Sequence, residues 1–112
     1  MPLFKPKALF KEHVIADPAA DFRTARRIER YRVSDSAVYI PAGFIWQYFP
    51  LSAVTRASRA RRRVESETSM TGWSDEYPAI AVFFGERKHY LEMDRDGPTD
   101  TLLALLNAAA GV

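Results

Sequence analysis

The alternation of hydrophobic and polar positions changes along the chain, and each change predicts a different kind of structure. Up to residue 22, apolar residues are scattered among prolines and lysines, which indicates a loosely ordered N-terminal arm. Within this arm Asp17 offers an N-cap and Pro18 suits the first helical position, so a single helical turn is expected at 18–22. The remaining residues, 23–112, are expected to form one domain.

From residue 23 the chain contains short runs rich in β-branched and aromatic residues, separated by turn-forming residues. The predicted strands are 27–33, 37–40, 44–49, 54–63, 79–84 and 88–93. Most connections between them are short, which favours antiparallel hairpins. Residues 52–67 also fit a helix, because apolar residues recur there at helical spacing, and a strand is the interpretation we adopt. The polar stretch 65–78 predicts a long, mobile loop.

The C-terminal segment carries the clearest helical signal. Pro98 and Asp100 suit a first helical turn, and Gly111 is placed to end the helix. An apolar stripe lies between them, formed by Leu102, Leu105, Leu106 and Ala109. Strands followed by one amphipathic helix predict a mainly β fold: a strongly bent antiparallel sheet, or a partly open barrel, closed by the C-terminal helix.

One segment and the order of the elements carry a family resemblance. The segment Tyr-Phe-Pro-Leu-Ser-Ala-Val-Thr at 48–55, followed at 91–108 by the end of the last strand and the helix, resembles the bacterial pleckstrin-homology-like and GRAM-like domains. The resemblance covers roughly residues 23–110. It implies a pleckstrin-homology-like fold without catalytic residues, used to bind phosphoinositides, peptides or partner domains. The arginine-dense stretch 56–63 and the loop 65–78 depart from the family pattern.

Composition and charge add two constraints. The chain has no cysteine, which excludes disulfides and cysteine-ligated metals and fits a cytoplasmic location. No apolar run is long enough for a transmembrane segment. The net charge of +2 hides an asymmetry: residues 1–63 carry thirteen Lys/Arg against five Asp/Glu, whereas residues 64–112 carry three against nine. Either the two halves neutralise each other, or the chain meets an acidic partner or a second copy of itself.

No motif indicates catalysis, a metal or a cofactor. The two histidines, His13 and His89, are too few for a metal site, and no carboxylate is well placed to complete one. Phosphate-cradling glycine loops, dinucleotide fingerprints and nucleophile motifs are missing from the sequence. We therefore expect no cofactor and no metal, and an enzyme ranks a distant third among the functions considered.

Two residue groups carry the functional hypotheses. Phe44, Trp46 and Tyr48 share one face of a strand and suggest an interface for a protein partner or a homo-oligomer, so a non-enzymatic binding or scaffold module is the first hypothesis. The alternative is an anionic lipid module that uses the arginine-rich strand, because guanidinium groups suit phosphates. Its candidate ligand-binding residues are Arg56, Arg59, Arg61, Arg62 and Arg63. Nucleic acid ranks below lipid, because no aromatic residues are interleaved with these arginines.

Overall fold

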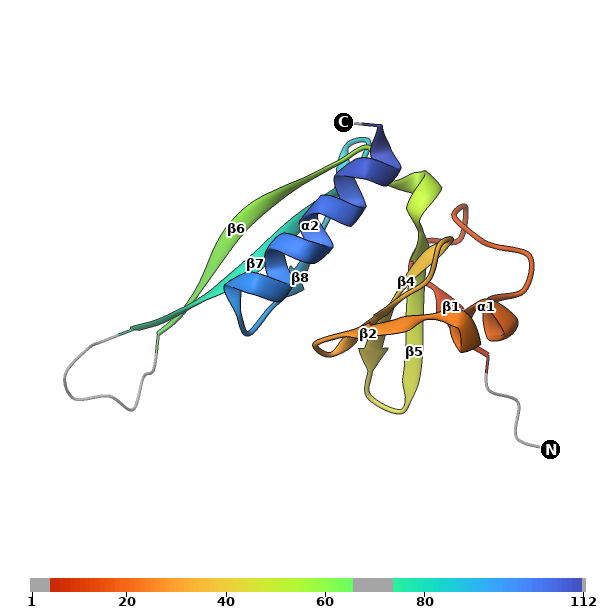
Figure 1. Ribbon diagram of the computed structural model, residues 1–112, viewed down its shortest axis with the longest axis horizontal. Coiled ribbons are helices and arrows are strands. Elements are labelled where there is room, and N and C mark those ends of the chain that lie inside the picture. Colours follow the sequence, from red (N-terminus) through yellow and green to blue (C-terminus); the bar gives the residue numbers. More distant parts are fainter. Residues whose placement is uncertain (1–4, 66–73, 112) are drawn as a thin grey trace.

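The computed structural model describes residues 5–65 and 74–111, without the side chains of 62–65 and 74–76. The fold is mainly β, with a long C-terminal helix (Figure 1). Its elements are β1 (Lys7–Ala8), α1 (Pro18–Thr24), β2 (Arg26–Ile28), β3 (Tyr31–Val33), β4 (Ala37–Ala42), β5 (Ile45–Pro50), the 3-10 turn η1 (Leu51–Ala53), β6 (Arg56–Glu65), β7 (Ser74–Phe84), β8 (Arg87–Glu92) and α2 (Asp96–Ala110).

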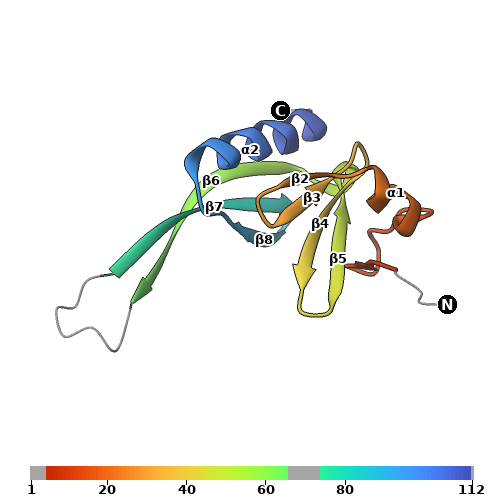
Figure 2. The same ribbon diagram turned by 60° about the horizontal axis from the view of Figure 1, so that its bottom comes forward.

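The strands form two sheets rather than a closed barrel. The first sheet has the order β1-β5-β4-β3-β2 and the second the order β6-β7-β8. All neighbouring strands are antiparallel except β1, which pairs in parallel with β5, so the first sheet is mixed and not purely antiparallel as predicted. The chain passes from one sheet to the other through η1, and Figure 2 shows the two sheets inclined to each other with α2 lying along the second.

A common core joins both sheets to α2. Leu102 and Leu106 of α2 are fully buried against residues such as Phe49 of the first sheet and Ile80 of the second. The predicted C-terminal helix is confirmed, and it ends at Gly111, which adopts the left-handed φ of 77°. Only part of the predicted apolar stripe is buried: Leu102 and Leu106 are, whereas Leu105 is half-buried and Ala109 is exposed.

The doubtful stretch 52–67 is mostly a strand, since η1 ends at residue 53 and β6 begins at Arg56. Two other predictions, one of a strand and one of a loop, were wrong in detail. The expected strand 27–33 is a tight hairpin, because Glu29 adopts a φ of 54° and turns the chain back on itself. The expected loop 65–78 is partly strand, because β7 already begins at Ser74, and the rest of that stretch, 66–73, lies outside the described residues.

Ion pairs connect the two oppositely charged halves of the chain. The Arg59 guanidinium on β6 contacts Asp96 at 2.8 Å and also binds Asp100, both on α2. Arg30 lies 2.7 Å from Asp94 and 3.9 Å from Glu92. Arg87 binds Glu12. In the pairs of Arg59 and Arg30 the cation comes from the basic half and the carboxylates from the acidic half, so these pairs partly neutralise the asymmetry of the sequence inside the fold. The Arg87–Glu12 pair also joins the two halves, but with the opposite polarity.

The N-terminal segment packs against the first sheet through β1 and α1. Asp17 caps α1, since its Oδ1 accepts the Ala20 N–H at 3.1 Å, and Pro18 occupies the first turn as predicted. Asp21 of α1 accepts hydrogen bonds from the Ser34 and Tyr39 hydroxyls, both at 2.5 Å. The boundary expected at residue 22 therefore falls within a helix that is hydrogen-bonded to the sheet.

Candidate functional site

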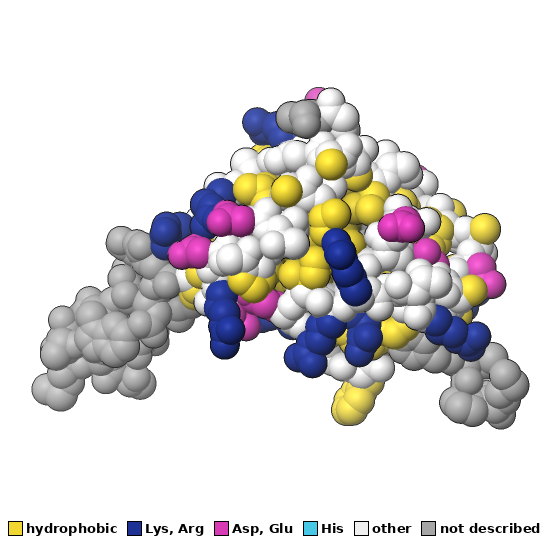
Figure 3. All heavy atoms as spheres, in the orientation of Figure 1, with side chains coloured by type: hydrophobic (Ala, Val, Ile, Leu, Met, Phe, Trp, Pro, Cys, Tyr) yellow, Lys and Arg dark blue, Asp and Glu magenta, His cyan; other side chains and the backbone are white. Residues whose placement is uncertain are grey.

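Exposed apolar side chains gather at one edge of the first sheet. Among the described residues, three large apolar side chains are exposed: Val14 by 63%, Phe44 by 107% and Ile45 by 42%. Phe44 lies at the tip of the β4–β5 hairpin, where Gly43 adopts a φ of 65°. Val14 and Ile45 line one open pocket. In Figure 3 a hydrophobic group protrudes from the lower edge of the molecule, with Lys and Arg side chains close by.

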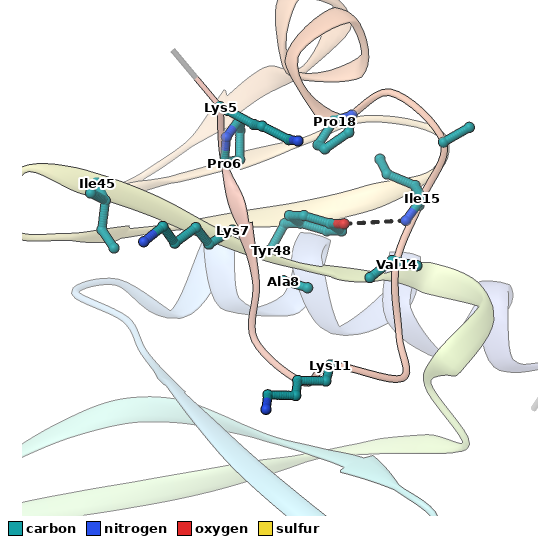
Figure 4. Close-up of a pocket in the computed structure, with 11 residues that line it drawn as sticks. Lys5, Pro6, Lys7, Ala8, Lys11, Val14, Ile15, Pro18, Ile45 and Tyr48 are labelled. Atoms are coloured by element: carbon teal, nitrogen blue, oxygen red, sulfur yellow. Dashed lines mark hydrogen bonds between the residues drawn. The ribbon is translucent and has the colours of Figure 1, made fainter. Parts of the chain in front are cut away.

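This pocket lies between the N-terminal segment and β5 (Figure 4). The parallel pairing of Lys7 with Gln47 fixes one wall, and the Leu9 N–H donates to the Tyr48 carbonyl at 2.7 Å. The chain then turns, and the Ile15 N–H donates to the Tyr48 hydroxyl at 3.2 Å. Residues 5–18 therefore form a strap around the ring of Tyr48 and border an open hollow of about 770 Å³.

The charge around the pocket has one sign. Lys5, Lys7 and Lys11 are exposed on its rim, and none of the residues that line it is acidic. Within the described part of the chain these lysines form no ion pair or hydrogen bond between side chains. The nearby Glu12 is held by Arg87, and hydrogen bonding to its own backbone lowers the pKa of its carboxyl. The remaining walls are apolar, so the pocket combines an apolar surface with three cations that have no acidic partner among the described residues.

Further cations surround the same hairpin. Arg27, Arg30 and Arg32 line a shallow hollow beside Trp46, on the β2–β3 side of the sheet. Lys88 lines another hollow that includes Pro41, close to the hairpin tip. Figure 3 shows Lys and Arg side chains near the protruding apolar group on the same side of the molecule. This side, formed by the pocket, the Phe44 tip and their cations, is called the basic apolar face below.

The structure separates the three aromatic residues predicted as an interface. Tyr48 is buried and Trp46 is half-buried, with the Trp46 ring centroid 5.1 Å from that of Phe22 and 5.9 Å from the Arg32 guanidinium carbon. Only Phe44 lies free of the fold, because α1 and the strap cover the strand face from residue 46 onward. The sequence pattern predicted that the three rings share one strand face. It could not predict that α1 and the strap cover two of them and leave Phe44 exposed.

The arginines of β6 are distributed over both faces of the second sheet. Arg59 is held by α2, whereas the Arg56 guanidinium lies on the other side, 4.1 Å from the centroid of the Phe83 ring. Arg61 is exposed. Arg62 and Arg63 belong to the strand, but their side chains lie outside the described part of the structure. Among the arginines whose side chains are described, Arg56 and Arg59 thus have neighbours within the fold.

Other kinds of site find little support in the described residues. No three His, Asp or Glu side chains gather there closely enough to hold a metal ion. His13 lies in a ring cluster with Phe10 and Phe84, and burial lowers the pKa of His89. None of the described helices is both long enough and apolar enough to cross a membrane.

The pocket was missed by reasoning from the sequence, although it left a signal. Three lysines at positions 5, 7 and 11 alternate with apolar residues in a segment that was interpreted as a loose arm. Such a pattern is also typical of an edge strand that covers apolar surface while its charges stay in solvent. No family model, curated protein or solved structure matched the chain.

Proposed function

We propose that the chain is a non-enzymatic binding module of pleckstrin-homology-like architecture, and that its basic apolar face binds the surface of an anionic membrane. The architecture is supported by the order of elements: four antiparallel strands β2–β5, three antiparallel strands β6–β8, and then α2. The segment 48–55, which carries the family resemblance, forms the passage from one sheet to the other.

The observation that carries the membrane proposal is the fully exposed ring of Phe44, which precedes Ile45 in the wall of a pocket rimmed by three lysines. Isolated exposed apolar residues are ordinary, but here two of the three described ones line the lysine-rimmed pocket, and the third, Phe44, is the chain neighbour of one of them. An aromatic ring at a hairpin tip can enter the interfacial region of a bilayer while the lysines remain among the lipid headgroups. Because Phe44 is already exposed, the β4–β5 hairpin can bind a membrane without a change of fold.

The expected affinity follows from these groups. Transferring one Phe side chain from water contributes about 1.5–3 kcal/mol. Each lysine close to an anionic surface contributes about 1 kcal/mol, and therefore three contribute about 3 kcal/mol at moderate salt. The sum of about 4.5–6 kcal/mol corresponds to a Kd between about 0.5 mM and about 40 µM of accessible lipid. Such binding is weak, reversible and sensitive to salt.

Co-sedimentation with vesicles tests the proposal. The wild type should sediment with vesicles that contain about one-third phosphatidylserine and stay in solution with pure phosphatidylcholine vesicles. Phe44→Ser, and separately the triple change of Lys5, Lys7 and Lys11 to Gln, should each reduce binding about tenfold or more. Both sites are exposed, so the melting temperature should hardly change.

The matched control removes the same charge elsewhere. Arg26, Arg61 and Arg95 are exposed and line none of the hollows of the basic apolar face. Their replacement by Gln should reduce vesicle binding far less than the lysine change. A greater loss in the arginine variant would move the lipid site to the surface of those arginines and overturn the proposed face. Failure of the wild type to bind even at low salt would overturn membrane binding altogether.

A protein partner is the second candidate, and the same exposed Phe44 favours it. A single aromatic anchor at the centre of an interface often contributes most of the binding energy. Binding that needs Phe44 but is insensitive to both salt and the lysine change would support a protein partner instead of a membrane.

A further inference from the structure

The lysine-rimmed pocket has a feature that membrane docking alone does not use. Tyr48 is only 2% exposed, and its hydroxyl accepts the Ile15 N–H at 3.2 Å. A phenol hydroxyl can both accept and donate, and when buried it usually does both. The described part of the chain offers no acceptor for the Tyr48 hydroxyl proton. A buried donor without an acceptor therefore borders the pocket.

The surroundings of this donor select the ligand chemistry. Lys5, Lys7 and Lys11 provide positive charge without a competing carboxylate, so the missing acceptor is best supplied by an anionic oxygen. Figure 4 shows the Tyr48 hydroxyl directed toward Ile15, with Lys5 and Pro18 on one side of the ring and Val14 near its other side. Lys7 and Lys11 lie farther from this hydroxyl in the same view, so the positive charge is spread along the rim of the pocket.

We infer that the pocket binds a single anionic amphiphile, whose phosphate or carboxylate accepts the Tyr48 proton and whose alkyl chain lies on Val14, Ile15 and Ile45. This inference rests on the proposed function, because it names the kind of lipid molecule that the basic apolar face can hold. A hollow of about 770 Å³ falls within the range of small-molecule sites, so it accommodates an anionic group together with part of an alkyl chain. The strap that forms it, residues 5–18, lies before the region of family resemblance.

Soluble probes separate this pocket from membrane docking. Isothermal titration calorimetry with decyl phosphate, kept below its micelle concentration, should show saturable binding to the wild type. Inorganic phosphate should bind at least tenfold more weakly because it lacks the chain. A neutral decyl glycoside should also bind at least tenfold more weakly because it lacks the charge. Equal binding of either control probe would overturn the inference.

Two variants test the donor and the charge. Tyr48→Phe removes the hydroxyl and should weaken decyl phosphate binding tenfold or more, the usual effect of losing a hydrogen bond to a charged group. Lys7→Gln should weaken decyl phosphate binding about fivefold. Because Lys7 is exposed, this variant should fold normally, and it keeps the test possible if Tyr48→Phe proves unstable. The control is Tyr31→Phe, which removes another buried hydroxyl: it donates to the Glu92 carbonyl at 2.8 Å and does not line this pocket. Affinity unchanged by Lys7→Gln, or unchanged by Tyr48→Phe in a folded protein, would overturn the inference.

The two proposals can fail independently. If the wild type sediments with anionic vesicles but does not bind decyl phosphate, the pocket inference is wrong and membrane docking stands. If decyl phosphate binds through Tyr48 but vesicles do not, membrane docking is wrong and the pocket serves a monomeric amphiphile in solution.

Discussion

The hydrogen bonds of Asp21 allow a sharp prediction about how the N-terminal segment is held. Asp21 lies in the first turn of α1, and its Oδ2 accepts both the Ser34 and the Tyr39 hydroxyls. Both donors belong to the first sheet or its turn and are buried. Burial and the Asp21 carboxylate raise the pKa of Tyr39 well above its usual value, so this hydroxyl stays protonated and donates.

Asp21→Ala should remove most of this attachment. A hydrogen bond to a charged group contributes about 1.5–3 kcal/mol. Tyr39 keeps a second acceptor, the Pro18 carbonyl at 3.2 Å, whereas Ser34 keeps only the Ala37 carbonyl at 3.4 Å. We therefore expect a loss of about 2–4 kcal/mol in the free energy of unfolding rather than two full contributions.

Urea unfolding measures this loss directly, and Trp46 fluorescence reports on the same region because its ring packs on Phe22 of α1. The midpoint should fall by on the order of 1–2 M urea. Asp35→Ala, at an exposed position in the turn before β4, should change stability by less than about 0.5 kcal/mol. A double-mutant cycle with Tyr39→Phe should show a coupling energy above about 0.5 kcal/mol. A loss for Asp21→Ala no larger than that of Asp35→Ala would refute the reasoning.

Three further predictions concern the core, the link between the sheets and the response to pH. Leu102→Ala should cost about 2–5 kcal/mol and clearly more than Leu105→Ala, because only Leu102 is fully buried; equal losses in thermal unfolding would contradict this. Glu29→Gln should cost about 1 kcal/mol, because the Glu29 carboxylate accepts the N–H groups of Asp94 at 2.6 Å and Arg95 at 3.0 Å; hydrogen exchange of those amides should rise. Burial lowers the pKa of His89, so protonation of its ring opposes folding, and the free energy of unfolding should fall as the pH drops below about 6.5. In His89→Gln this decrease in stability at low pH should be smaller; an equal decrease would mean that other groups cause it.

Local patterns in the sequence predicted the elements that local forces define. The stripe around Leu102 and the glycine at 111 determine α2, and the runs of β-branched and aromatic residues locate most strands. The short hairpin at Glu29 was missed because a non-glycine residue with positive φ leaves no compositional sign. Its conformation is supported from a distance, by the hydrogen bonds that the side chain makes to residues 94 and 95.

The candidate site was harder to predict because it depends on contacts between distant segments. Strand β1 has only two residues, and its parallel pairing with β5 cannot be inferred from the pattern of either segment. The pocket needs this pairing together with the bond between Ile15 and Tyr48, which are 33 residues apart. By contrast, the exposure of Phe44 follows from its place beside Gly43 at a hairpin tip, where a side chain has few neighbours.

The position of β6 gives its five arginines a consequence that requires no ligand. In the second sheet β6 is an edge strand, ten residues long, and such an edge is a template for uncontrolled addition of strands from other molecules. If the β6 strands of two copies paired, guanidinium groups would face one another across the new ladder, and like charges placed opposite destabilise a sheet. Charge repulsion between these arginines would therefore oppose edge-to-edge addition of a second copy, a consequence that needs no ligand.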